Sequence, residues 1–316
     1  MQPLSPRNSI LVQQSGQKLW TSATISPHPA QRGGSAKSSN CLNNDRMSLP
    51  ASTRSLSPVI CRRTSASMTS DLFDERIGAL RRSRALKRGR ELFLHERAFD
   101  DIHDRLSIVR RRFRSALLIN CLDPAWPERL REHADMVKVI EPERVMEIEP
   151  GSFDLCVAIG WLDTANDLPG ALLTARFALE GDSLFIGAIS GGDTLPALRA
   201  AMRSADERMD AATPHAHPRI EPAALTNLLT SAGFAMPVVD VDRVQVRYKE
   251  LADLVRDLRS MGATNILRAR SGRPLSRAAV NSAEAQFLSG AEGGRVTEMF
   301  EILHFAAWTP AAPNNG

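Results

Sequence analysis

The chain has 316 residues, of which 43% are hydrophobic, so it can bury one or two sizeable cores. Its formal net charge is +4, but residues 1–67 carry eight Lys or Arg and one acid, which leaves −3 for residues 68–316. The basic character therefore comes from the N-terminal segment and is poor evidence for a nucleic-acid surface. No apolar run is long enough to span a membrane.

The cysteines exclude two common kinds of small site. Cys41, Cys61, Cys121 and Cys156 show no C-x-x-C spacing, which argues against a zinc site or a disulfide framework. A reducing compartment fits this usage best. We expect Cys156 to be a small, buried apolar residue.

Residues 1–67 form a distinct N-terminal segment. They are rich in Ser, Pro, Asn, Gln and Arg, show no sustained apolar period, and are expected to be a disordered tail. Their acid-poor composition fits an organelle transit peptide, and it equally fits translation that starts at Met68. The expected compartment is the bacterial cytoplasm, or the mitochondrial matrix if the tail is a transit peptide.

The rest of the chain shows an α/β pattern. A helical period predicts N-terminal helices over 68–112, and alternating strands and helices follow through 113–310, typical of a parallel sheet. The expected strands are 116–120, 136–140, 154–159, 183–189, 238–248 and 297–308. Helices within 200–296 are expected to cover the strand ends as part of the same domain, and 311–316 to be a disordered end.

Two expected helix boundaries rest on single residues. The helix in 167–181 is expected to end at Gly181, because glycine readily takes the left-handed conformation that closes helices. The helix that follows the fourth strand is expected to be capped by Asp193 or Thr194.

Candidate ligand-binding residues follow the strands, because open α/β sheets bind ligands beyond the carboxyl ends of their strands. In chain order they are Asn120, Cys121, Asp123, Glu141, Gly160, Trp161 and Asp163. Glu141 is placed to hold ribose hydroxyls, or is an exposed turn acid before Pro142. Trp161 either belongs to the core or covers a ligand.

Other polar or flexible positions have simpler interpretations. Gly191 and Gly192 are expected to turn the chain rather than to contact a ligand. His215 and His217 lie in a proline-flanked loop and are expected to be solvated. No phosphate loop, nucleophile elbow or zinc signature occurs in the sequence.

Six stretches carry a resemblance to a known family. They are "LFDERIGALRRSRAL" (72–86), "GSFDLCVAIG" (151–160), "NDLPGAL" (166–172), "GGDTLPALR" (191–199), "AGFAMPVVDVDRVQVRY" (232–248) and "LVRDLRSMGATN" (254–265). Over residues 70–310 the chain resembles the class I S-adenosylmethionine methyltransferase superfamily. Within it, the chain is similar to the group that holds the mitochondrial complex I assembly factor described as an arginine hydroxylase, and its bacterial relatives.

The resemblance implies a Rossmann-like fold with a mostly parallel seven-stranded sheet, helices on both faces, and an antiparallel last strand at 297–308. It also implies S-adenosylmethionine as cofactor, with Glu141 as the ribose-binding acid. Asp154 matches the Asp of the family's "SFD", and Asn166-Asp167 match the pair that opens the next helix. A protein substrate, with a respiratory complex I subunit as one candidate, is implied as partner.

The chain departs from the family after the first strand. Where the family has a Leu-Asp-Leu-Gly type motif and further glycines, this chain has Leu118-Ile119-Asn120-Cys121. A Cβ is therefore expected where the methionine end of the cofactor would lie against the backbone. The acid that would pair with the ammonium group of the cofactor is also missing, unless Asp123 takes its place. The family's His-Trp pair before "NDLP" is replaced by Asp163-Thr164.

Three hypotheses remain open on these residues. The chain is an enzyme that acts on a protein, a non-catalytic scaffold that assists assembly of a subunit, or a small-molecule methyltransferase. The last requires an intact cofactor site and fits residues 119–124 least well.

Overall fold

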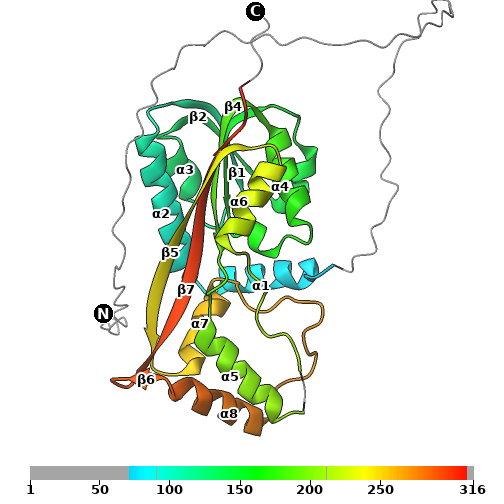
Figure 1. Ribbon diagram of the computed structural model, residues 1–316, viewed down its shortest axis with the longest axis vertical. Coiled ribbons are helices and arrows are strands. Elements are labelled where there is room, and N and C mark those ends of the chain that lie inside the picture. Colours follow the sequence, from blue (N-terminus) through cyan, green and yellow to red (C-terminus); the bar gives the residue numbers. More distant parts are fainter. Residues whose placement is uncertain (1–70, 90, 211, 312–316) are drawn as a thin grey trace, which may run out of the picture. The chain divides into compact units, whose positions relative to one another are not determined.

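A computed structural model describes residues 71–89, 91–210 and 212–311, which belong to one compact unit (Figure 1). The tail expected at 1–67 and nearly all of the expected end at 311–316 lie outside the described residues. The helices are α1 (Glu75–Lys87), α2 (Phe93–Ile108), α3 (Trp126–Leu130), α4 (Leu168–Ala178), α5 (Pro196–Glu207), α6 (Pro222–Ser231), α7 (Leu251–Ser260) and α8 (Arg277–Leu288), with 3-10 turns η1 (Pro142–Glu147) and η2 (Leu162–Thr164).

The strands form one seven-stranded, mostly parallel sheet. They are β1 (Phe113–Ile119), β2 (Ala134–Ile140), β3 (Phe153–Ile159), β4 (Leu179–Ser190), β5 (Ala235–Tyr248), β6 (Ala291–Glu292) and β7 (Arg295–Trp308). Their order is β2-β1-β3-β4-β7-β5, and the short β6 pairs with β7 outside this path. β1 to β4 are parallel, and β7 is antiparallel to both β4 and β5. The Rossmann-like fold class and its antiparallel last strand are confirmed.

Both faces of the sheet are covered because successive strand residues point to opposite sides. In β1, Leu118 joins the cluster that includes Ile102 of α2, whereas Leu117 joins the cluster that includes Leu172 of α4. Figure 1 shows α2 and α3 on one face and α4 and α6 on the other. Cys156 of β3 is buried in the second cluster, and burial raises the pKa of its thiol, so it behaves as the apolar residue we expected.

β5 and β7 continue past the ends of the parallel strands as a two-stranded ribbon. Ser190, the last residue of β4, pairs with Ile302, whereas β7 pairs with β5 back to Val296 opposite Tyr248. α5, α7 and α8 lie along this ribbon (Figure 1). They therefore lie beyond the carboxyl ends of β1, β3 and β4, where the fold binds ligands.

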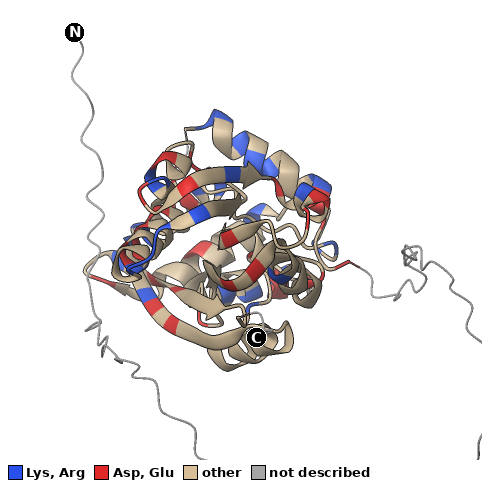
Figure 2. Ribbon diagram, turned by 90° about the horizontal axis from the view of Figure 1, so that it is seen from above, with Lys and Arg blue, Asp and Glu red and all other residues tan. Residues whose placement is uncertain are grey.

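Ion pairs fasten α2 to the sheet. Arg97 donates hydrogen bonds of 2.6 and 3.1 Å to the carboxylate of Asp242 on β5. Arg105 donates one of 2.7 Å to Asp240 on the same strand. Figure 2 shows Lys and Arg, like Asp and Glu, on several of the helices and strands. These contacts fix the position of His95, one of the first residues of α2, relative to the ribbon.

The expected end of α4 is wrong. The helix ends at Ala178, and Gly181 lies inside β4. Leu179 already has an extended backbone and pairs with Phe153 of β3. Leu179 therefore joins the sheet directly after the helix, and α4 ends without a glycine.

The expected cap of α5 is also wrong. The helix begins at Pro196, and neither the side chain of Asp193 nor that of Thr194 accepts a backbone N–H from its first turn. Glu298 of β7, a fully buried carboxylate, instead accepts the N–H groups of Ala197 at 3.2 Å and Leu198 at 2.9 Å. A residue a hundred positions away in the sequence supplies the cap, which no local pattern could indicate.

Candidate functional site

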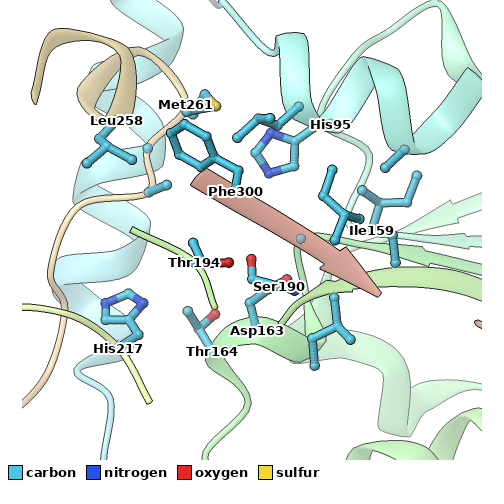
Figure 3. A pocket seen from close by; sticks show the side chains of 18 of the residues that line it. His95, Ile159, Asp163, Thr164, Ser190, Thr194, His217, Leu258, Met261 and Phe300 are labelled. Carbon is cyan, nitrogen blue, oxygen red and sulfur yellow. Dashed lines mark hydrogen bonds between the residues drawn. The ribbon is translucent and has the colours of Figure 1, made fainter. Parts of the chain in front are cut away.

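Two cavities lie beyond the ends of the parallel strands. The inner cavity, of about 130 Å³, lies between α2, η2, α7 and the ends of β3 and β4, and its lining includes His95, Gly160, Asp163, His217, Arg219 and Phe300 (Figure 3). The α1 cavity, of about 420 Å³, lies between α1 and the ends of β1 and β2, and its lining includes Ala79, Leu86, Asn120, Cys121, Glu141 and Glu143.

The two cavities share Arg82, Leu122 and Met261, which form the partition between them. A Cβ placed on Gly160 would lie 3.1 Å from Cδ1 of Leu122 and 3.3 Å from Nε2 of His95. The side chain of Leu122 is therefore packed tightly against the backbone at the exit of β3. It separates residues that the sequence predicted would share one ligand.

Glu141 lies in the α1 cavity, as a ribose-binding acid would need to. Its side chain is exposed, and we find no hydrogen bond or ion pair between its carboxylate and another described residue. Glu143, two residues on, is engaged in a 3.2 Å ion pair with Arg82 of α1. Glu141 is thus the carboxylate of this cavity that remains available to a ligand.

Asn120 takes a left-handed backbone conformation. Its φ is +63°, a region that asparagine tolerates better than other side chains do. Its Nδ2 donates to the carbonyl of Ile159 at 3.0 Å, and its N–H donates to Ile140 at 3.0 Å, so it ties three strand ends together. Cys121 does not have a positive φ. We expected the side chain of Cys121 to restrict the backbone, but the residue that takes the left-handed conformation is Asn120.

Asp123 does not reach either cavity lining. Its Oδ1 accepts the N–H of Ala125 at 2.7 Å, and its carbonyl accepts the thiol of Cys121 at 3.0 Å. These bonds close the turn that leads into α3. The structure therefore does not bring this carboxylate to the place of the missing ammonium partner.

Gly160 and Asp163 line the inner cavity, whereas Trp161 between them lines neither cavity. Trp161 packs against the core cluster beneath α4 and α6, which favours its interpretation as a core residue. Asp163 accepts the N–H of Ser190 at 2.7 Å and a 3.4 Å hydrogen bond from Arg219. The seven candidates are therefore divided between two cavities, a turn and the core.

His95 and His217 are inner-cavity residues that the sequence analysis did not identify as ligand contacts. Figure 3 shows the two rings at opposite ends of the cavity. Nδ1 of His95 is buried without a hydrogen-bond partner among the described residues. Burial lowers the pKa of His95, so its imidazole is neutral at pH 7.

The expectation that His217 is solvated is wrong. The side chain is buried, its Nε2 accepts the N–H of Ile266 at 3.0 Å, and its ring lies 5.2 Å from that of Phe73. Burial lowers the pKa of His217 to about 4. His215 is partly buried too and lies 2.7 Å from a carboxylate oxygen of Asp206.

Gly191 and Gly192 make room for carboxylates rather than for a ligand. A Cβ on Gly191 would lie 2.3 Å from Oε1 of Glu301, and one on Gly192 would lie 2.1 Å from Oε1 of Glu221. Neither glycine lines the inner cavity or the α1 cavity. This agrees with the expectation that they turn the chain.

The polar residues matched to family motifs hold the fold. Asp154 accepts the N–H of Ser115 at 2.9 Å at the start of β1, at the opposite end of the sheet from the cavities. Asn166 accepts the N–H of Phe73 at 2.7 Å and so anchors the segment before α1. Asp167 caps α4.

Comparison with known proteins gives the family. The chain is 33% identical over 243 residues to the mitochondrial arginine-hydroxylase NDUFAF5 of Danio rerio. The matched region covers 69% of this chain and 75% of that protein. The chain belongs to the NDUFAF5 family. NDUFAF5 of Mus musculus is 31% identical over 241 residues, or 68% of this chain and 70% of that protein. No protein-family model matches.

This chain is also similar to a methyltransferase. The malonyl-[acyl-carrier protein] O-methyltransferase of Laribacter hongkongensis is 34% identical to this chain over 172 residues, covering 53% of the chain and 54% of that enzyme. Among solved structures, the YcgJ protein of Bacillus subtilis overlaps with 69% of the chain and all of its own length, at a TM-score of 0.43 and 8% identity. The resemblance drawn from the sequence is confirmed.

Two further findings bear on the site. In residues 71–89, 91–210 and 212–311, no group of three or more His, Cys, Asp or Glu side chains is placed to hold a metal ion. Within the same residues, no helix is long and apolar enough to cross a bilayer.

Proposed function

We propose that this NDUFAF5-family chain acts on a protein substrate and binds S-adenosylmethionine weakly, through a degenerate loop at the exit of β1. The observation that carries the proposal is the partition at Leu122, which divides the residues expected to share the cofactor. The catalytic residues remain unassigned.

The residues fit one end of the cofactor and not the other. The α1 cavity offers the free carboxylate of Glu141, which suits two ribose hydroxyls. The methionine end would have to pass Leu122 to reach Gly160 and Asp163, and Leu122 fills that passage. The cofactor as a whole therefore does not fit the site with Leu122 in this position, and we derive no reaction step through it.

A non-catalytic scaffold is the second candidate, and the same loop favours it. Asn120, Cys121 and Asp123 use their polar groups within the protein rather than presenting them to a ligand. A scaffold would keep the fold and the partner surface without needing an open cofactor site. A small-molecule methyltransferase, which requires tight cofactor binding, is disfavoured by the partition.

The relatives support the choice of substrate and compartment. Those named arginine-hydroxylase NDUFAF5 suggest an arginine side chain of a protein as the group acted on, with a respiratory complex I subunit as one candidate partner. We place the chain in the bacterial cytoplasm, or in the mitochondrial matrix if residues 1–67 are a transit peptide.

Mass spectrometry of a candidate substrate protein tests the proposal. The full chain is incubated with that protein and S-adenosylmethionine, and peptides are searched for a methyl mass increment. The proposal expects an increment that Glu141→Ala reduces and that Glu149→Ala, an exposed acid outside both cavities, leaves unchanged. Stable binding of the partner with no increment in the wild type would contradict enzymatic function and support the scaffold.

A further inference from the structure

Arg219 is a buried cation that the proposed function does not use. Its side chain is 11% exposed and lines the inner cavity. A guanidinium has five N–H donors. The hydrogen bond found for Arg219 in the described part of the chain is a single one, 3.4 Å long, to Oδ1 of Asp163.

Asp163 compensates Arg219 only in part. The same oxygen of Asp163 already accepts the N–H of Ser190 at 2.7 Å, a much shorter bond. At 3.4 Å the contact with Arg219 is outside the usual range for an N–H···O bond. Burial lowers the pKa of Arg219, as expected for a cation that has lost water without gaining full hydrogen bonding.

The surroundings restrict what can pair with Arg219. Ile159, Leu258 and Phe300 give the inner cavity an apolar wall. The two imidazoles of the cavity, His95 and His217, are neutral at pH 7 because burial lowers their pKa values. The lining also holds Arg82, which pairs with Glu143 at 3.2 Å, and Glu301, which pairs with Arg243 at 3.0 Å. Arg219, with its single long contact to Asp163, is therefore the cation of this cavity whose pairing is least complete.

We propose that the inner cavity binds a carboxylate, held by the guanidinium of Arg219. The planar fork of arginine matches the two oxygens of a carboxylate, and such bidentate pairs are among the strongest charge-assisted hydrogen bonds. A phosphate dianion fits less well, because Asp163 lies on the same guanidinium and repels a second negative charge more strongly.

The carboxylate has two possible sources. It belongs to a separate acid that occupies the inner cavity, or to the methionine end of S-adenosylmethionine once Leu122 has moved. Only the second source rests on the proposed function. The partition at Leu122 keeps the inner cavity distinct from the α1 cavity, so the first source stands even if the cofactor does not bind.

Isothermal titration of the full wild-type chain with matched ligand pairs tests the proposal without any variant. One pair is butyrate and butyramide, which differ in charge and hardly in shape. The other is S-adenosylmethionine and its decarboxylated analogue. Saturable binding of butyrate and not of butyramide identifies a separate acid as the source. Tighter binding of S-adenosylmethionine than of its analogue, with no butyrate binding, identifies the cofactor.

Variants then assign the effect to Arg219. Arg219→Met should weaken binding of the carboxylate ligand about tenfold or more and leave the uncharged ligand unaffected. Arg219→Lys keeps the charge but loses the planar fork. Its affinity for the carboxylate ligand should lie between those of the wild type and Arg219→Met. Arg176→Met, an arginine of α4 outside both cavities, is the matched control and should change nothing.

Three results would overturn the proposal. In the first, butyrate binds no better than butyramide, and S-adenosylmethionine binds no better than its decarboxylated analogue. In the second, Arg219→Met, shown to be folded by its thermal melt, binds the carboxylate ligand as well as the wild type does. In the third, Arg176→Met weakens binding as much as Arg219→Met. Failure of S-adenosylmethionine to bind, with butyrate binding intact, would count against the proposed function alone.

Discussion

Replacing Leu122 with alanine should tighten the binding of S-adenosylmethionine. Leu122 is half-buried and packs against Gly160, so a cofactor that spans both cavities must first displace it. Full burial of a leucine side chain is worth about 1.5–3 kcal/mol, and half of that, about 0.75–1.5 kcal/mol, is the cost of moving Leu122 aside. Alanine removes that cost, which corresponds to roughly three- to twelvefold tighter binding.

Calorimetric titration of the wild type and Leu122→Ala measures the difference. Leu94→Ala is the matched control, because Leu94 is also half-buried and lines the inner cavity but is not part of the partition. Urea unfolding should show Leu122→Ala to be less stable by about 1–2 kcal/mol. Unchanged or weaker cofactor binding in a folded Leu122→Ala would show that Leu122 does not block the cofactor, and the reasoning would fail.

Four other predictions follow from the same residues. Glu141→Ala should weaken cofactor binding by about 1–3 kcal/mol in the same titration, and an unchanged affinity would place the ribose elsewhere. A chain that starts at Met68 should melt at the temperature of the full chain, whereas a loss of many degrees would give residues 1–67 a structural role. The fragment 200–296 should show no cooperative thermal transition, and a sharp one would identify a separate domain. His217 has a folded pKa of about 4 against the usual 6.5, so the unfolded chain binds the proton first. Stability should therefore fall by about 3 kcal/mol as pH drops from 6.5 to 4, and His217→Gln, compared by urea unfolding at both pH values, should lose this dependence.

The strands could be predicted from the sequence because their side chains are buried on both faces. Continuous apolar runs such as Leu117–Ile119 can be recognised without knowing what packs on them. The exit of each strand could also be located, since parallel strands end at one edge of the sheet. For this reason Glu141 and Gly160 were found beside cavities.

The contacts across long stretches of sequence could not be predicted. Glu298 of β7 caps a helix about a hundred residues earlier in the chain, and the buried His217 accepts the N–H of Ile266, 49 residues away. The pairing of Arg219 with Asp163 likewise joins two loops that no local pattern connects. The sequence did contain one indication of the inner cavity. His217 and Arg219 lie two residues apart in a loop that follows a strand and a helix, which is where cavity residues are found in this fold.

The division of the site at Leu122 also had a signal in the sequence. The resemblance implies glycines in this loop, and a leucine there adds a bulky side chain where the backbone is expected to approach a ligand closely. What the sequence could not show is where that side chain points, because Asn120, and not Cys121, takes the left-handed backbone conformation.

Titration of the full chain with S-adenosylmethionine tests the central claim most directly. The account predicts weak binding, with a dissociation constant above about 100 μM, corresponding to less than about 5.5 kcal/mol of binding free energy. Binding in the low micromolar range by the wild type would contradict it, because the partition at Leu122 could not then obstruct the cofactor.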